Sequence, residues 1–357
     1  MHLPFALIPR PTPSRVATWL SPVVALALTI LCGMVLFAAL GKSPWQAVAV
    51  FFIQPLSSLR GVSEVLLKAT PLILCGVGLA LCFRANVWNI GAEGQLIAGA
   101  IAGGGVALLA TRASGGEMVV AVLVAAALGG MAWAAITAWL KDRFNANEIL
   151  VSLMLVYVAQ LLLSYMVHGP WRDPAGMGFP QSALFERAAR MPLLLEGTRL
   201  HLGFGLSLLA AVVAWLLLAR GFIGFQLKVA GLAPLAARYA GFSQRQILWF
   251  TLLVSGALAG IAGAAEAAGP VGQLTPSISP GYGFAAIIVA FVGRLHPLGV
   301  VAAGVLMALF YVGGELSQSR LGLPSSLTGV YQGLLLFFLL ACDTFITYRV
   351  QWKRLPN

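Results

Sequence analysis

The stretch Asn89-Ile90-Gly91-Ala92-Glu93-Gly94-Gln95 opens an apolar run that continues to Ala110. It carries a carboxylate and two side-chain amides, and an ionisable group beside a membrane span is costly unless it faces a partner or a pathway inside the protein. Its small residues Gly91, Ala92 and Gly94 let neighbouring backbones come close. The stretch therefore predicts a polar, closely packed start to a membrane helix.

The composition extends this prediction to the whole chain. Of the 357 residues, 60% are hydrophobic and 9% are charged, whereas soluble domains carry about a quarter charged residues. We therefore expect an all-α fold, a polytopic membrane bundle of helices. The net charge of +11 does not indicate a nucleic-acid partner, because the basic residues lie mostly at the ends of apolar runs, where the positive-inside rule places many of them.

The apolar runs give the number of membrane spans. A spanning helix needs about 20 apolar residues. Ten runs meet or approach this length, at residues 16–40, 62–83, 88–110, 118–140, 149–168, 201–219, 247–269, 283–293, 298–315 and 326–347. The run 283–293 is short, which favours a half-helix or an earlier start. The run 44–59 is short and bounded by proline, which favours an interfacial helix over a span.

Charge orients the predicted bundle. The segment 220–246 carries four basic residues and no acidic one, which favours the cytoplasm, whereas the segment 169–200 mixes both signs and is expected outside the cytoplasm. An even number of spans puts both termini in the cytoplasm. The chain then divides into a cytoplasmic N-terminal segment, 1–15, a transmembrane domain, 16–347, and a cytoplasmic tail, 348–357, whose aromatic and basic residues suit an anchor at the membrane lipid.

Nucleotide hydrolysis has little support on this chain. Gly41-Lys42-Ser43 resembles the end of a phosphate-binding loop, but that loop needs a glycine five residues earlier, and Leu36 stands there. Any ATP-driven work therefore needs another chain.

Other enzymatic chemistry also lacks its motifs. Neither His-Glu-x-x-His nor Gly-x-Ser-x-Gly occurs, and the four cysteines lie inside apolar runs, which favours packing over metal binding or disulfides. We expect no catalytic residue, no metal and no cofactor on this chain.

Polar residues inside the spans are the candidates for a translocation path. Asn89, Glu93 and Gln95 open the third predicted span, and Glu266 stands late in the seventh. Glu93 lies in a first helical turn, where the helix dipole favours a negative charge, so a capping role and a pathway role both remain open for it. Glu266 has neither a first-turn position nor an adjacent base, which favours a polar group facing the interior of the bundle.

A second candidate site lies in the basic segment 220–246. Residues Leu232 to Gly241 predict a short helix, with Pro234 in its first turn and Gly241 as its stop. A short helix of small residues between two spans can seat in a groove on a partner, although an ordinary interfacial loop helix fits equally well. The candidate contact residues are Leu232, Ala233, Pro234, Ala236, Ala237, Arg238 and Gly241.

These stretches resemble a known family. Ala236-Ala237-Arg238 followed by Gly241 is similar to the coupling-helix region of ABC importer permeases in the branched-chain amino acid and ribose superfamily. Asn89 to Gln95 resembles the nucleoside and simple-sugar branch of that superfamily. Val156 departs from the branch, which has Asn at that position. Four further stretches resemble the branch in the same order along residues 60 to 340: Asn145-Ala146-Asn147-Glu148 with Met154-Leu155, Pro180-Gln181-Ser182, Gly281-Tyr282-Gly283-Phe284, and Gly293-Arg294-Leu295-His296-Pro297.

The resemblance implies a permease subunit of an ABC importer in the bacterial plasma (inner) membrane. Its solute would be a nucleoside or related simple sugar, delivered by an extracytoplasmic solute-binding protein. Its partners would be an ABC ATPase subunit, whose closure moves the coupling helices, and a second permease subunit, a paralogue. Two alternatives stay open: a branched-chain amino acid permease of the same superfamily, and an ion-coupled secondary transporter.

Overall fold

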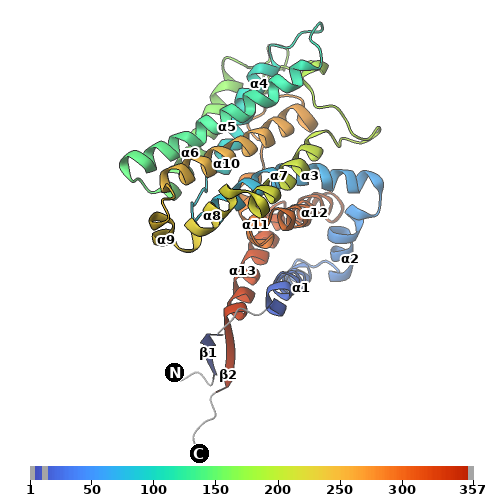
Figure 1. The fold of residues 1–357 in the computed structure, drawn as a ribbon. Helices are drawn as coiled ribbons and strands as arrows, with labels where there is room; N and C mark the ends of the chain where they lie inside the picture. Colours follow the sequence, from blue (N-terminus) through green and yellow to red (C-terminus); the bar gives the residue numbers. More distant parts are fainter. Residues whose placement is uncertain (1–4, 10–14, 353–357) are drawn as a thin grey trace, which may run out of the picture. The chain divides into compact units, whose positions relative to one another are not determined.

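The computed structural model describes residues 5–9 and 15–352. The predicted terminal segments therefore fall partly outside the described residues, at 1–4, 10–14 and 353–357. The described part is built of helices, turns and one pair of short strands (Figure 1), which confirms the predicted all-α membrane bundle. Residues 16–347, treated above as one domain, fall into two compact units. The large unit is Leu59–Ala308, and the small unit is Met1–Ser58 with Leu309–Asn357.

The large unit contains most of the helices. They are α3 (Leu59–Arg84), α4 (Ala92–Ala107), α5 (Glu117–Phe144), α6 (Glu148–His168), α7 (Gly203–Arg220), α8 (Phe222–Leu232), α9 (Pro234–Tyr239), α10 (Gln244–Glu266), α11 (Tyr282–Val292) and the first part of α12 (Pro297–Leu321). A 3₁₀ turn, Arg187–Ala189, lies in the 169–202 loop, and a π-helical turn, Ala267–Val271, follows α10.

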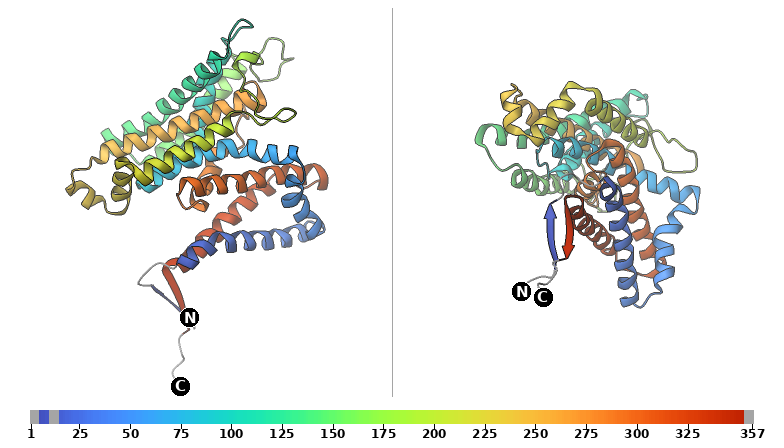
Figure 2. Two further views of the ribbon diagram at one scale, coloured as in Figure 1. Left: turned by 45° about the vertical axis from the view of Figure 1, so that its right-hand side comes forward. Right: turned by 60° about the horizontal axis from the view of Figure 1, so that its bottom comes forward.

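The small unit packs around an aromatic cluster. It contains α1 (Arg15–Ala39), α2 (Pro44–Val48), the turns Ala49–Ile53 and Gln54–Leu56, the rest of α12, and α13 (Leu327–Thr347). Phe51 stacks on Tyr331 with ring centroids 4.6 Å apart, and both rings are fully buried. Two strands that the apolar runs did not predict, β1 (Phe5–Pro9) and β2 (Tyr348–Trp352), pair antiparallel beside each other (Figure 2).

The span count is close to the prediction of ten. Among the described residues, the helices long and apolar enough to cross a membrane are α1, α3, α5, α6, α7, α10 with its π turn, α12 and α13. The predicted spans 88–110 and 283–293 instead form α4, with 16 residues, and α11, with 11. At 1.5 Å per residue these are about 24 Å and about 16 Å long, less than the hydrocarbon core of about 30 Å.

Glycines bring α4, α5 and α10 into close contact. A Cβ on Gly130 of α5 would overlap the carbonyl oxygen of Gly256 on α10, and a Cβ on Gly99 of α4 would overlap the backbone of Gly260. Figures 1 and 2 show α5 and α10 side by side along most of their length. Small residues permit this packing between membrane helices, and it fixes α4 within the bundle.

The two segments that the charge pattern predicts on opposite sides of the membrane, 169–200 and 220–246, lie at opposite ends of α10. Ser243, directly after the α9 region, caps the start of α10 by accepting from the backbone N–H of Gln246. Beyond the other end, the Ser182 hydroxyl of the 169–202 loop accepts from the backbone N–H of Leu274 at 2.9 Å. The 169–202 loop and α9 thus lie at opposite ends of the large unit (Figure 1), and which end faces the cytoplasm stays a prediction from the charges.

Candidate functional site

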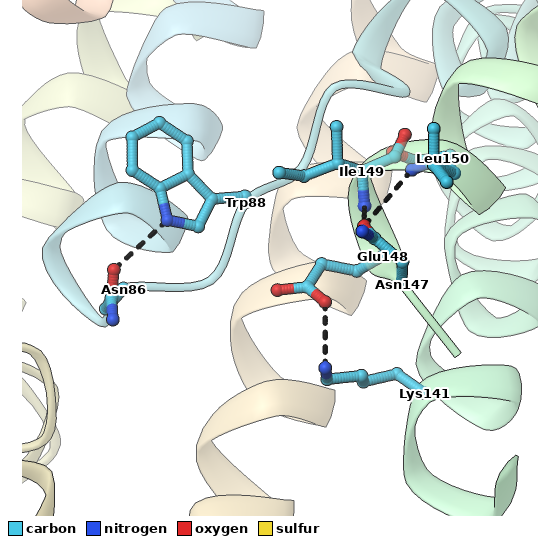
Figure 3. A network of polar contacts seen from close by, with 8 residues as sticks. Asn86, Trp88, Lys141, Asn147, Glu148, Ile149 and Leu150 are labelled. Carbon is cyan, nitrogen blue, oxygen red and sulfur yellow. Dashed lines mark hydrogen bonds and ion pairs between the residues drawn. The ribbon is translucent and has the colours of Figure 1, made fainter. Parts of the chain in front are cut away.

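The connection between α3 and α4 is a sharply turned segment. After α3, Asn86 adopts a left-handed φ of 57°, which Asn tolerates better than most residues. The backbone N–H groups of Asn86 and Val87 donate to the carbonyl oxygens of Phe83 and Cys82, at 3.1 and 2.9 Å, and so form a Schellman motif. The Asn86 side chain accepts from the Trp88 indole at 3.1 Å (Figure 3). These bonds direct the chain into α4.

Asn89 is fully buried and uses its whole amide group. Its Nδ2 donates to Gln95 Oε1 and to Ser255 Oγ, each at 3.0 Å. Its Oδ1 accepts from Gln95 Nε2 and from the backbone N–H of Gly91, again at 3.0 Å. The two donors and two acceptor sites of an Asn amide are then all satisfied. In this conformation Asn89 and Gln95 fix the start of α4 to α10.

The small residues of the same stretch pack against α6. The Ile90 backbone N–H donates to Ser152 Oγ at 3.2 Å. A Cβ on Gly91 would lie 2.8 Å from the Ser152 Cβ, and a Cβ on Gly94 would lie 3.0 Å from the Val156 Cα. The prediction that small residues here admit a neighbouring backbone is confirmed.

Glu93 joins the first turns of α4 and α11. It is 1% exposed, and its Oε2 accepts from the backbone N–H of Gly283 at 2.7 Å. The Ser279 hydroxyl oxygen, in the chain just before α11, accepts from the backbone N–H groups of Gly281 and Tyr282 at 3.2 and 3.1 Å. A Cβ on Gly283 would overlap the backbone of Glu93. The carboxylate thus lies at two helix N-termini, where a negative charge is favoured, and it caps the start of α11; a pathway role for Glu93 stays a prediction.

The chain between α10 and α11 is not helical. After the π turn, Gly272 adopts a φ of 71°, and residues 272–281, here called the break segment, continue without helix. Leu274 and Ile278 are 0% and 2% exposed, whereas Pro276, Ser277 and Pro280 are exposed. Non-helical backbone at membrane depth occurs only where protein buries it or where it lines a water-filled cavity. The break segment ends at the N-terminus of α11, beside Glu93.

Glu266 lies away from the other candidate path residues. It is the last residue of α10 and is partly buried. Ser255, which bonds to Asn89, lies 11 residues earlier on the same helix, or about 16 Å along its axis. The structure therefore brings Asn89 and Gln95 into direct contact, places Glu93 in the same first turn, and leaves Glu266 toward the other end of α10.

The segment Leu232–Gly241 has the predicted start and stop. Pro234 is the first residue of α9, and Gly241 adopts a φ of 79°. The N–H groups of Gly241 and Phe242 donate to the carbonyl oxygens of Arg238 and Ala237, at 3.1 and 2.9 Å, which completes a Schellman motif. Helix α9 is therefore a single short helix with a defined end.

All of the predicted contact residues of this segment are exposed except Ala237, which is fully buried. Two large apolar residues are exposed beside them, Leu235 at 74% and Tyr239 at 94%. Leu235 and Tyr239 were absent from the predicted contact residues. Positions 235 and 239 are four residues apart, which places them on one face of α9, and this spacing is the sequence signal that identifies them.

The segment is anchored to α3 through a glycine. Gly231 lies in the last turn of α8, just before α9. A Cβ there would overlap the carbonyl oxygen of Arg84, the last residue of α3. The backbone of α8 therefore rests directly on the end of α3, from which the chain turns toward Asn89 and Glu93.

Ion pairs hold the neighbouring helix ends. Lys141 Nζ lies 3.0 Å from Glu148 Oε2, and Asn147 caps α6 by accepting from the backbone N–H of Ile149 at 2.9 Å (Figure 3). Asp142 accepts from the Trp249 indole at 3.1 Å and from Arg245 Nε at 2.8 Å. These charged groups tie the adjacent ends of α5, α6 and α10.

The buried histidine His201 holds the backbone at the start of α7. His201, in the loop before α7, is 1% exposed, and its Nδ1 accepts from the Gly203 backbone N–H at 3.1 Å. Burial lowers the pKa of the His201 imidazole to about 4. Among residues 5–9 and 15–352, no group of His, Cys, Asp and Glu side chains is arranged to hold a metal ion.

Comparison with known proteins identifies the family. Residues 61–340 match the family described as "Branched-chain amino acid transport system / permease component". The chain is 37% identical to the glucose ABC transporter permease protein TsgB13 of Haloferax volcanii, over 98% of this chain and 94% of that protein. It is 30% identical to the guanosine ABC transporter permease protein NupP of Bacillus subtilis, over 91% and 93%.

A third relative, the nucleoside ABC transporter permease protein NupB of Lactococcus lactis, is 27% identical over 90% of each chain. The residues matched by the family, 61–340, include Glu93, its partner Gly283 and helix α9. The chain belongs to the branched-chain amino acid transport system permease family, and it is a multi-pass membrane permease component of a transport system.

Proposed function

We propose that this chain is the permease subunit of an ABC importer for a nucleoside or a related simple sugar. Support for the solute comes from the relatives, because glucose and guanosine share a hydroxyl-bearing sugar ring. The full importer, in a bacterial plasma membrane, would comprise a second permease subunit, a separate ATPase and an extracytoplasmic binding protein that delivers the solute.

The observation that carries this proposal is the exposure of α9. Leu235 and Tyr239 present apolar surface, and Arg238 beside them is also exposed. Helix α9 has six residues and is too short to span a membrane. Exposed apolar side chains grouped on a short helix are typical of a protein–protein contact. A docked ATPase would cover this face, and Arg238 would meet an acidic group there.

The predicted path residues take part in this proposal through α11. Asn89 and Gln95 hold α4 in place, and Glu93 holds the N-terminus of α11. Movement of α11 against α4 would release Glu93 and open a route between the two permeases. Glu266, at the far end of α10, would contribute a polar group to the outer part of the same route.

Reconstitution into vesicles tests the proposal. The permease pair, its ATPase and its binding protein are expected to take up guanosine or glucose only when ATP is supplied. ATP-driven uptake of leucine, with neither of these solutes transported, would instead support a branched-chain amino acid importer. Uptake driven by an ion gradient in the absence of the ATPase would support a secondary transporter.

A further inference from the structure

We propose that the exposed side of the break segment, residues 272–281, lines the aqueous translocation path, with Ser277 in the path and Phe284 at its inner end. This rests on the proposed function and adds to it a wall of the path that the sequence pattern did not identify.

The break segment extends into the depth of the membrane beside α4. Near one end of the break segment, Leu274 packs against Gly104 of α4, so closely that a Cβ on Gly104 would lie 2.6 Å from a Leu274 methyl carbon. Just beyond the other end, Gly283 packs against Glu93 of the same helix. Gly104 and Glu93 are 11 residues apart, or about 16 Å along α4. The break segment thus runs along α4 over about half of the membrane core of about 30 Å.

The break segment has one side buried in the protein and one side exposed. Leu274 and Ile278 pack into the protein, whereas Pro276, Ser277 and Pro280 do not. Non-helical backbone cannot face lipid, because lipid offers no partner for backbone N–H and C=O groups. The exposed side at this depth therefore faces water or another subunit, and in a permease this is the position of the path.

The break segment and the start of α11 carry groups that can bind a sugar or a nucleobase. The break segment carries two hydroxyls, on Thr275 and Ser277, beside its backbone carbonyls, whereas the Ser279 hydroxyl is used within the protein by the backbone N–H groups of Gly281 and Tyr282. These groups can exchange hydrogen bonds with the hydroxyls of a sugar ring as it passes. Phe284, which is 37% exposed in the first turn of α11, presents an aromatic ring on which a nucleobase can stack. The segment therefore suits a neutral, hydroxyl-rich solute.

Cysteine accessibility tests the inference in the assembled importer. Cys32 and Cys342 are first replaced by Ser, and Cys75 and Cys82 stay because both are fully buried. Ser277→Cys is then treated with a charged, membrane-impermeant methanethiosulfonate, with and without ATP. We expect this reagent to react at least tenfold faster at Ser277→Cys than at Leu161→Cys, because a thiolate forms in water and not in lipid.

Two control positions separate aqueous exposure from other causes. Leu161 of α6 is 71% exposed but lies on a spanning helix, so lipid is expected to cover it. Ile278 is 2% exposed within the break segment itself, so Ile278→Cys should react slowly. Reaction at Ser277→Cys should also lower uptake at least tenfold, and excess transported solute should slow the reaction.

The inference is overturned if Ser277→Cys reacts no faster than Leu161→Cys in every nucleotide state, or if its modification leaves uptake unchanged. Failure of the proposed function looks different. The unmodified importer would then show no ATP-driven uptake of guanosine or glucose, while Ser277→Cys would still react rapidly.

Discussion

Two stretches of this chain look alike in sequence and differ in structure. Asn89–Gln95 and Leu232–Gly241 each combine small residues with one charged side chain. In the first, the polar side chains are buried and bonded to groups of the same chain. In the second, only Ala237 is buried, and large apolar side chains are exposed. Small residues next to a charge therefore do not by themselves decide burial: the first stretch has its partner within the chain, and for the second we propose a partner outside it.

The largest effect that would test the internal contact comes from Gly283→Ala. The added Cβ would overlap the Glu93 backbone, and overpacking a tight core costs about 1–3 kcal/mol or more. We expect loss of uptake together with a lower unfolding temperature in detergent, measured by size-exclusion chromatography after heating. Gly329→Ala is the control, because its Cβ would meet no atom within 4 Å. Equal stability of the two variants would show that the α4–α11 contact is loose.

A buried polar residue outside both stretches extends the comparison. His201 accepts a hydrogen bond as the neutral imidazole, and its folded-state pKa of about 4 lies below its ordinary value of 6.5. The corresponding stabilisation is complete above about pH 6.5 and is lost as the pH falls toward 4, by at most about 3 kcal/mol. Unfolding temperatures measured from pH 8 to pH 4 should show this loss.

His201→Asn is the matched variant for that measurement. Its side-chain oxygen can still accept from the Gly203 backbone N–H but does not titrate, so the loss of stability between pH 6.5 and 4 should be reduced. An unchanged pH dependence would assign the effect to other groups.

Leu235→Glu tests the external contact. A charge in the centre of the exposed face of α9 should weaken ATPase binding at least tenfold, or about 1.4 kcal/mol, and leave the permease folded. Co-purification of the ATPase measures this. Met177→Glu changes an apolar residue that is 94% exposed on the 169–202 loop and should leave ATPase binding unchanged. Full co-purification with Leu235→Glu would place the ATPase contact elsewhere.

The variants with the smallest expected effect test which side of the membrane each exposed residue faces. Met177 and Tyr239 are both 94% exposed, so Met177→Cys and Tyr239→Cys should label equally well once reagent reaches them. In intact cells we expect an impermeant reagent to label Met177→Cys alone, and both after permeabilisation. Labelling of Tyr239→Cys from outside would reverse the orientation and remove α9 as an ATPase contact.

The parts of this structure that sequence predicted are those set by local chemistry. Apolar runs gave the spanning helices, and Pro234 and Gly241 gave the ends of the α9 region, because hydrophobic length and backbone preference act within a few residues. The role of Glu93 was left open, because its partner Gly283 is 190 positions away. The exposure of Leu235 and Tyr239 depends in the same way on distant packing.

The break segment shows a different limit of prediction from sequence. Residues 283–293 read as a short apolar run with an uncertain start, and only the fold reveals that 272–281 continues without helix beside α4. Its prolines and the left-handed Gly272 and Gly281 are local signals of a non-helical backbone. They do not reveal which side is buried, since burial depends on α4.

The paired strands at the two ends of the chain make circular permutation of this permease feasible. Phe5 stands opposite Trp352 in the ladder, and directly opposed residues of antiparallel strands lie about 5 Å apart. A short linker from β2 to β1 would then close the pair as a hairpin. New ends could be opened at the exposed Met177 in the 169–202 loop, where, in the predicted orientation, a purification tag would report on the opposite face of the membrane from the two strands.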